Sequence, residues 1–235
     1  SVAVKFEELE LSNLTHIISG VVPASGELNG DFKFTTSGSS DFSSKLSIAG
    51  LTVLQTPIGD VTLGVDHSKD SYNLSLSLRG NRTTLETKGT YGGPKGNEIL
   101  DAVVNIEQLN MEVIKAFSLG QVSNADGIVK GKIVVKGKPT HPDINGSLTF
   151  SEVVITPAYL ATTFKLNDET ISIRNDNITL NNFTIVDEAE NKATFKGNIN
   201  IKNYTNPEID LTVTSKNFQV LNTIKGDNEL FYGKV

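Results

Sequence analysis

Apolar and polar side chains alternate along most of this chain. Between residues 72 and 78, for example, Tyr or Leu occupies every second position, and Asn or Ser occupies the positions between them. A period of two is typical of a strand with one apolar and one polar face. About fourteen segments of four to seven residues are strand candidates, separated by turns rich in Gly, Pro, Asn and Asp. The pattern therefore predicts a mainly β protein.

Two short stretches change to the period of a helix. In residues 109–117, apolar side chains follow the first one at four, five and eight positions, which places them on one face of about two helical turns. A similar stretch covers residues 12–18, where Ser12 suits the N-cap position. We expect one or two short helices beside the strands.

The chain also resembles itself at a distance of about 100 residues. Three motifs occur twice: Ala24–Gly30 and Ala125–Gly131, Thr56-Pro57 and Thr156-Pro157, and Val4–Leu9 and Val104–Leu109. We expect a single continuous β segment over 1–235, with one repeat unit at about 1–100, a second at about 101–210 and the start of a third at about 211–235. Stacked repeats complete each other's cores and form an elongated array. The break inside the third unit predicts a fragment of a longer protein.

Composition supports the β prediction and argues against several classes of protein. Val, Ile and Thr number 62 and Ala only 10, and β-branched side chains favour strands over helices. A net charge of −6 with three arginines provides no surface that neutralises phosphates, so we expect no nucleic-acid partner. No apolar run approaches the roughly 18 residues of a membrane-spanning helix. The absence of cysteine excludes disulfides, thiolate catalysis and cysteine metal ligands.

The residues that carry chemistry in other proteins are isolated here or lie in turns. His16, His67 and His141 have no second histidine nearby, and we interpret them as solvated side chains. The acidic turn 187–190 fits a solvated hairpin tip better than a cation site, because it lacks the ligand order and glycine of an EF-hand. Paired carboxylates can meet from any two strands, but no pair stands out. With no GxSxG elbow and no Walker loop, we expect no enzyme activity, catalytic residue, metal site or cofactor.

The apolar sides of the strands remain as the candidate functional surface. They form either the core of an ordinary sandwich or the lining of a groove that stays open along its length, and periodicity does not separate these alternatives. For an open groove, the predicted lipid-lining residues are Phe32, Phe34, Leu46, Ile48, Leu74, Leu76, Leu78, Val104, Ile133, Val135, Leu148, Phe150, Ile171, Ile173, Ile178, Leu180, Phe195, Ile199, Ile201, Leu211 and Val213.

The order of several short motifs resembles a known family. The motifs are Gly26–Gly30 and its repeat Gly127–Gly131, then Gly137–Pro139, Pro142–Leu148, Thr156-Pro157, Asn181–Asp187, Ala193–Gly197, Asp210–Val213 and Asn217–Thr223. This order is similar to the C-terminal region of the TamB family of translocation and assembly module proteins, which is related to the AsmA-like, bridge-like lipid-transfer proteins. The resemblance covers residues 100–235 well and residues 1–99 more loosely, and each single motif is degenerate.

The resemblance implies both a fold and a function. It implies an elongated, strongly curved sheet, folded like a taco around an apolar interior, in a protein anchored in the inner membrane of a double-membraned bacterium. Such a segment lies in the periplasm and shields phospholipid acyl chains on their way between the two membranes. The family also implies a partnership with a TamA-type outer-membrane β-barrel protein, through regions outside this segment. It brings no catalytic residues.

Two other functions stay open from the sequence. The first is a scaffold or chaperone for outer-membrane proteins, in which an open strand edge pairs with a client strand. The second is a surface adhesin or glycan-binding β-repeat protein, which ranks last because the chain has no Trp and only five Tyr to form aromatic platforms.

Overall fold

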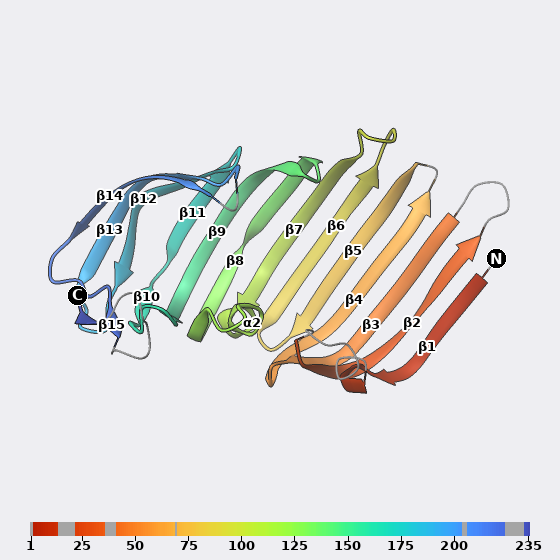
Figure 1. Ribbon diagram of the computed structural model, residues 1–235, viewed down its shortest axis with the longest axis horizontal. Coiled ribbons are helices and arrows are strands. Elements are labelled where there is room, and N and C mark those ends of the chain that lie inside the picture. Colours follow the sequence, from red (N-terminus) through yellow and green to blue (C-terminus); the bar gives the residue numbers. More distant parts are fainter. Residues whose placement is uncertain (1, 14–21, 36–40, 69, 204–205, 224–232) are drawn as a thin grey trace. The chain divides into compact units, whose positions relative to one another are not determined.

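The computed structural model describes residues 2–13, 22–35, 41–68, 70–203, 206–223 and 233–235. It contains a 14-stranded antiparallel sheet, in which the strands follow one another almost in chain order, and a two-stranded ladder, β15–β16 (Figure 1). The strands are β1 (Val2–Glu10), β2 (Ala24–Thr35), β3 (Asp41–Val53), β4 (Thr56–Ser68), β5 (Ser71–Gly80), β6 (Thr83–Gly92), β7 (Ile99–Asn110), β8 (Val122–Lys138), β9 (His141–Pro157), β10 (Phe164–Leu166), β11 (Glu169–Arg174), β12 (Asn177–Val186), β13 (Lys192–Asn200), β14 (Glu208–Ser215), β15 (Asn222–Thr223) and β16 (Gly233–Lys234). The prediction of a mainly β fold is confirmed.

Many strands are longer than the four to seven residues that the sequence suggests. β8 and β9 have 17 residues each, and β3 and β4 have 13 each. The sequence interpretation shortened them because it treated Gly and Asn as strand ends, whereas several glycines lie inside these strands. Gly30 in β2 and Gly131 in β8 both face a neighbouring backbone: a Cβ would lie 2.3 Å from the Lys45 carbonyl oxygen and 2.1 Å from that of Ser147, respectively. Only glycine, which has no Cβ, allows the neighbouring strand to approach this closely.

The helix predicted in residues 109–117 is present as α2 (Met111–Phe117). Asn110 caps it, because its side-chain oxygen accepts a hydrogen bond of 3.1 Å from the Glu112 backbone N–H. The buried face differs from the predicted stripe: Met111, Val113 and Ala116 are buried, while Phe117 is 58% exposed. Of the second expected helix, residues 11–13 are helical and residues 14–18 lie outside the described residues.

The contacts divide the chain into two compact units. Unit 1 comprises residues 1–108 and 132–144, and unit 2 comprises residues 109–131 and 145–235. The first part of β8 and the last part of β9 belong to unit 2, and the remainder of both strands belongs to unit 1.

Unit 2 has a closed core. Six side chains from α2 and four strands form its buried centre, namely Met111, Ala125, Val129, Val153, Leu166 and Phe183. The helix covers one side of the sheet, as expected for an antiparallel sheet that buries one face. The segment 218–223 adds to this cover: the ring of Phe218 stacks on that of Phe164 at 5.7 Å, and the Asn222 N–H donates to the Leu160 carbonyl at 2.9 Å.

Candidate functional site

The apolar side chains of unit 1 form four rows that cross β1 to β7. We call these rows together the apolar face. Two rows cross the centre of the sheet. The first contains Phe6, Gly30, Leu46, Leu63, Leu76, Thr87 and Val104. The second contains Val4, Phe32, Ser44, Val65, Leu74, Gly89 and Ala102. The aliphatic row contains Leu28, Ile48, Val61, Leu78, Leu85 and Ile106. The aromatic row lies at the other end of the strands. It contains the pair Phe34 and Phe42 on β2 and β3, and the successive neighbours His67, Tyr72, Tyr91 and Leu100 on β4 to β7.

The same registers place the polar residues on the opposite face. One polar row, for example, runs through Lys5, Asp31, Lys45, Gly64, Ser75 and Lys88. No Asp, Glu, Lys or Arg belongs to the four rows of the apolar face, and His67 is its one ionisable imidazole. The alternation of the sequence is therefore translated into an apolar and a polar face, although β-bulges shift the register near the ends of several strands and Val103 follows Lys88 in the polar row.

The apolar face is only half-buried. Val4 is 47% exposed, Phe34 42% and Leu63 36%, and most other members of the rows are intermediate in exposure. All strands of unit 1 belong to one sheet, and its described helical residues are 11–13, so the described part of this unit contains no second layer. A contiguous apolar surface without such a layer is typical of a binding site for a protein or lipid.

The two ends of the apolar face differ. Beyond the aliphatic row, the apolar side chains of the β3–β4 hairpin are buried: Leu51, Val53 and Ile58 are 9%, 5% and 1% exposed. At the aromatic row, the His67 and Tyr72 rings lie 4.6 Å apart, and the stacked rings of Tyr72 and Tyr91 lie 6.3 Å apart. The aliphatic row at one end of the face consists of hydrocarbon side chains alone, and the other end carries amphipathic rings.

His67 differs from its expected role as a solvated turn histidine. Its side chain is only 14% exposed and packs against Tyr72 on the apolar face. Nδ1 is buried and has no hydrogen-bond partner among the described residues, and it lies 3.7 Å from Asp41 Oδ1, too far for a hydrogen bond. The strand runs further than the sequence suggests, because β4 continues through Ser68 and His67 pairs with Tyr72 in the ladder. His141 is exposed, and His16 lies outside the described residues.

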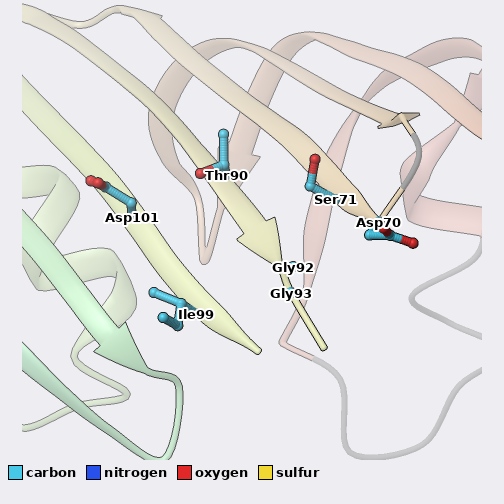
Figure 2. A pocket seen from close by; sticks show the side chains of 7 residues that line it. All are labelled: Asp70, Ser71, Thr90, Gly92, Gly93, Ile99 and Asp101. Carbon is cyan, nitrogen blue, oxygen red and sulfur yellow. The ribbon is translucent and has the colours of Figure 1, made fainter. Parts of the chain in front are cut away.

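The concavities of unit 1 lie mainly on its polar side. A hollow of about 530 Å³ at the ends of β5, β6 and β7 is lined by Asp70, Ser71, Thr90, Gly92, Gly93, Ile99 and Asp101 (Figure 2). A second hollow, of about 560 Å³, shares Thr90 and Asp101 with it. Gly92 and Gly93 provide no side chain at the end of β6, so the strand end that carries Tyr91 borders an open, polar space.

The predicted lipid-lining residues fall into two groups. Eight belong to the apolar face of unit 1: Phe32, Phe34, Leu46, Ile48, Leu74, Leu76, Leu78 and Val104. Ile133 and Val135 are half-buried on β8.

The other predicted lining residues belong to unit 2. Leu148, Phe150, Ile171, Leu180 and Phe195 pack against the core of that unit, and Ile173 is buried. Ile178, Ile199, Ile201 and Leu211 are half-buried, and Val213 is 52% exposed.

Sequence reasoning missed several members of the apolar face. Val61, Leu63, Leu85 and Tyr91 occupy the rows between or beside the predicted residues. The alternation Val61-Thr62-Leu63-Gly64-Val65 is the signal that identifies two of them. Tyr91 stands next to Gly92-Gly93, and its position so close to a turn hid its strand register.

Asp187 is the clearest correction at a single residue. It is fully buried rather than solvated at a hairpin tip. Its carboxylate accepts hydrogen bonds from the backbone N–H groups of Ala189 (2.9 Å), Asn191 (2.8 Å) and Gln219 (2.9 Å), and from the Asn191 side chain (3.0 Å). Burial alone would raise the pKa of Asp187, but these hydrogen bonds outweigh it and hold the pKa below its ordinary value. The carboxylate therefore ties the β12–β13 turn to the segment around Gln219.

The neighbouring carboxylates do not join Asp187 in a cation site. Glu188 accepts a hydrogen bond of 3.2 Å from the Thr163 N–H, and Glu190 pairs with Lys165. Across the described residues, no group of three His, Asp or Glu side chains is placed to hold a metal ion.

Comparisons with known proteins give no relative for this chain. No protein-family model matches it, and no curated protein or solved structure matches it either. None of the helices in the described residues combines the length and the apolar character needed to cross a membrane. The interpretation of the apolar face therefore rests on its own chemistry, which offers hydrophobic contact, one imidazole and two phenol groups.

Proposed function

We propose that this chain shields the acyl chains of phospholipids on the apolar face, as a non-enzymatic segment of a TamB-like or AsmA-like protein. In this proposal the sheet curves around the lipid tails in a taco-like groove, within the periplasm of a double-membraned bacterium. The observation that supports it most is an apolar face of seven strands with no Asp, Glu, Lys or Arg and no second layer in the described part of unit 1.

The dimensions of the face suit an acyl chain. From Tyr72 to Leu78 the strand advances six residues, or about 20 Å at roughly 3.3 Å per residue. One leaflet of a bilayer has a hydrocarbon depth of about 15 Å. Each methylene removed from water gains about 0.8 kcal/mol, so a sixteen-carbon chain gains on the order of 12 kcal/mol before any losses. A charge-free surface is required, because a carboxylate or ammonium against hydrocarbon would be strongly unfavourable.

Lipid extraction tests this proposal directly. The purified chain is stripped of lipid, mixed with vesicles of phosphatidylethanolamine and phosphatidylglycerol, and separated from them by flotation. We expect phospholipid in the protein fraction, identified by mass spectrometry of a solvent extract. Protein that repeatedly emerges free of lipid, while its circular dichroism still shows folded β structure, would contradict the proposal.

A second candidate function rests on the edges of the sheet. β1 and β14 each pair with one strand among the described residues, and seven of the eight residues of β14 are exposed. Such edges pair readily with an added strand. A scaffold for outer-membrane proteins, acting with a TamA-type barrel, would use them. Crosslinks from β14 to a client strand, in protein that extracts no lipid, would favour this function over lipid shielding.

A further inference from the structure

We propose that a lipid binds to the apolar face in one orientation along the strands, with its phosphate headgroup at the aromatic row and its acyl ends at the aliphatic row. This inference rests on the proposed lipid-binding function and adds a polarity to it. Three observations at the two ends of the face carry the argument: amphipathic rings at one end, a buried imidazole nitrogen beside them, and a dry hydrocarbon end opposite.

The aromatic row has the character of a membrane interface. His67, Tyr72 and Tyr91 lie on three adjacent strands, with ring centroids 4.6 Å and 6.3 Å apart. Tyr and His rings, which combine an apolar body with a polar tip, are favoured where hydrocarbon meets water. At the opposite end, the aliphatic row offers Leu78, Leu85 and Ile106 and no polar group at all.

The aromatic end also has hydrogen-bonding capacity. Nδ1 of His67 is buried without a hydrogen-bond partner among the described residues, and Asp41 Oδ1 lies 3.7 Å from it. A buried polar atom in this state favours an incoming partner, and the oxygens of a phosphate diester provide one.

The aliphatic end has the opposite properties. It adjoins the β3–β4 hairpin, where Val53 and Ile58 are 5% and 1% exposed. A hydrated headgroup at that end would lose water without gaining hydrogen bonds from the apolar rows, whereas terminal methyl groups lose nothing there. The difference between the two ends therefore favours one lipid orientation over its reverse.

Photo-crosslinking with two lipids reads out the orientation. The probes are two phosphatidylglycerols, one with a diazirine on the headgroup and the other with a diazirine at the acyl terminus. Trypsin cleaves after Arg82, Lys88 and Lys95, so that residues 83–88 with Leu85 separate from residues 89–95 with Tyr91. We expect the headgroup probe on peptide 89–95 and the acyl probe on peptide 83–88.

The outcomes separate this inference from the proposed function. A reversed pattern, or equal labelling of both peptides by both probes, would overturn the fixed orientation while lipid binding stands. Failure of both probes to bind the folded chain would overturn both proposals together.

A pair of variants adds a readout that does not depend on crosslinking. Tyr72→Phe with Tyr91→Phe keeps both rings and removes both hydroxyl groups. We expect about tenfold weaker binding of dipalmitoylphosphatidylglycerol, as for the loss of one or two hydrogen bonds, and unchanged binding of dipalmitoylglycerol, which lacks a phosphate. Tyr159→Phe, at a 59% exposed residue of unit 2, is the matched control and should change neither. Equal effects of the double variant on both lipids would contradict a headgroup contact.

Discussion

Units 1 and 2 have the same alternating sequence pattern, but the apolar face of the sheet is covered in unit 2 and uncovered in the described part of unit 1. In unit 2, α2 and the segment 218–223 cover the sheet, and Val153 in the resulting core is only 1% exposed. In unit 1, Leu63 has the same kind of strand position and is 36% exposed. The comparison shows that alternation specifies an apolar face, whereas a covering element decides whether that face becomes a core or remains available to bind.

The largest effect is expected from a charge in the covered face. Val153→Asp places a carboxylate in the buried centre of unit 2, whose six side chains are all apolar. We expect a loss of about 4 kcal/mol or more in the free energy of unfolding, measured by urea denaturation and circular dichroism. If the variant unfolds at the wild-type urea concentration, unit 2 has no closed core and its difference from unit 1 disappears.

Shortening a buried side chain of α2 tests the same contrast, with an intermediate expected loss of unfolding free energy. Met111 in α2 is 4% exposed, and Met111→Ala should reduce the free energy of unfolding by about 3 kcal/mol, because it leaves a cavity. Phe117→Ala on the same helix is the matched control: at 58% exposure, it should change the unfolding free energy by less than about 0.5 kcal/mol. Similar effects of the two substitutions would show that α2 does not cover the sheet as described.

A charge on the uncovered face should affect binding rather than folding. Leu76→Asp lies in the middle of the apolar face, and we expect binding of phosphatidylglycerol to weaken about thirtyfold, or about 2 kcal/mol. The unfolding free energy should change by less than in Val153→Asp, because the half-buried side chain keeps access to water.

The neighbouring residue provides the control for this variant. Ser77→Asp carries the same charge one position further, on the polar face, and should bind lipid as the wild type does. If both variants bind lipid normally, the apolar face is not the binding surface.

The smallest effect concerns pH and the single buried carboxylate of the β12–β13 turn. The pKa of Asp187 is lowered in the folded state, so its contribution to stability is present above the pKa of the unfolded chain and is lost as the pH falls through the folded pKa. Asp187→Asn should lower the unfolding free energy by about 1 kcal/mol at pH 7, as for weakened hydrogen bonds. The difference from the wild type should shrink below about pH 4. Urea titrations at both pH values measure it, and a constant difference would contradict a role for the carboxylate charge.

The sequence alone was enough to predict the mainly β class and to place several apolar side chains on the same face of the sheet. Residues such as Leu74, Leu76 and Leu78 were placed correctly together, because a period of two leaves little freedom once a strand forms. Local alternation did not indicate which strands pair, so Leu63 and Leu85 were not joined to that group. Asp187 was misjudged because its partners Asn191 and Gln219 are fixed by the turn and by a contact 32 residues away. The same limit applies to His67, whose surroundings come from Tyr72 across a turn.

The in-register rows of the apolar face have a consequence for stoichiometry. Seven neighbouring strands are separated by six spacings of about 4.8 Å, so the rows extend about 29 Å across the strands. An acyl chain is about as wide as one strand spacing, and Leu46, Leu63 and Leu76 offer it equivalent neighbours at successive positions. A surface with this repeat holds several hydrocarbon tails side by side, so saturation at more than one lipid per polypeptide is the expected binding ratio.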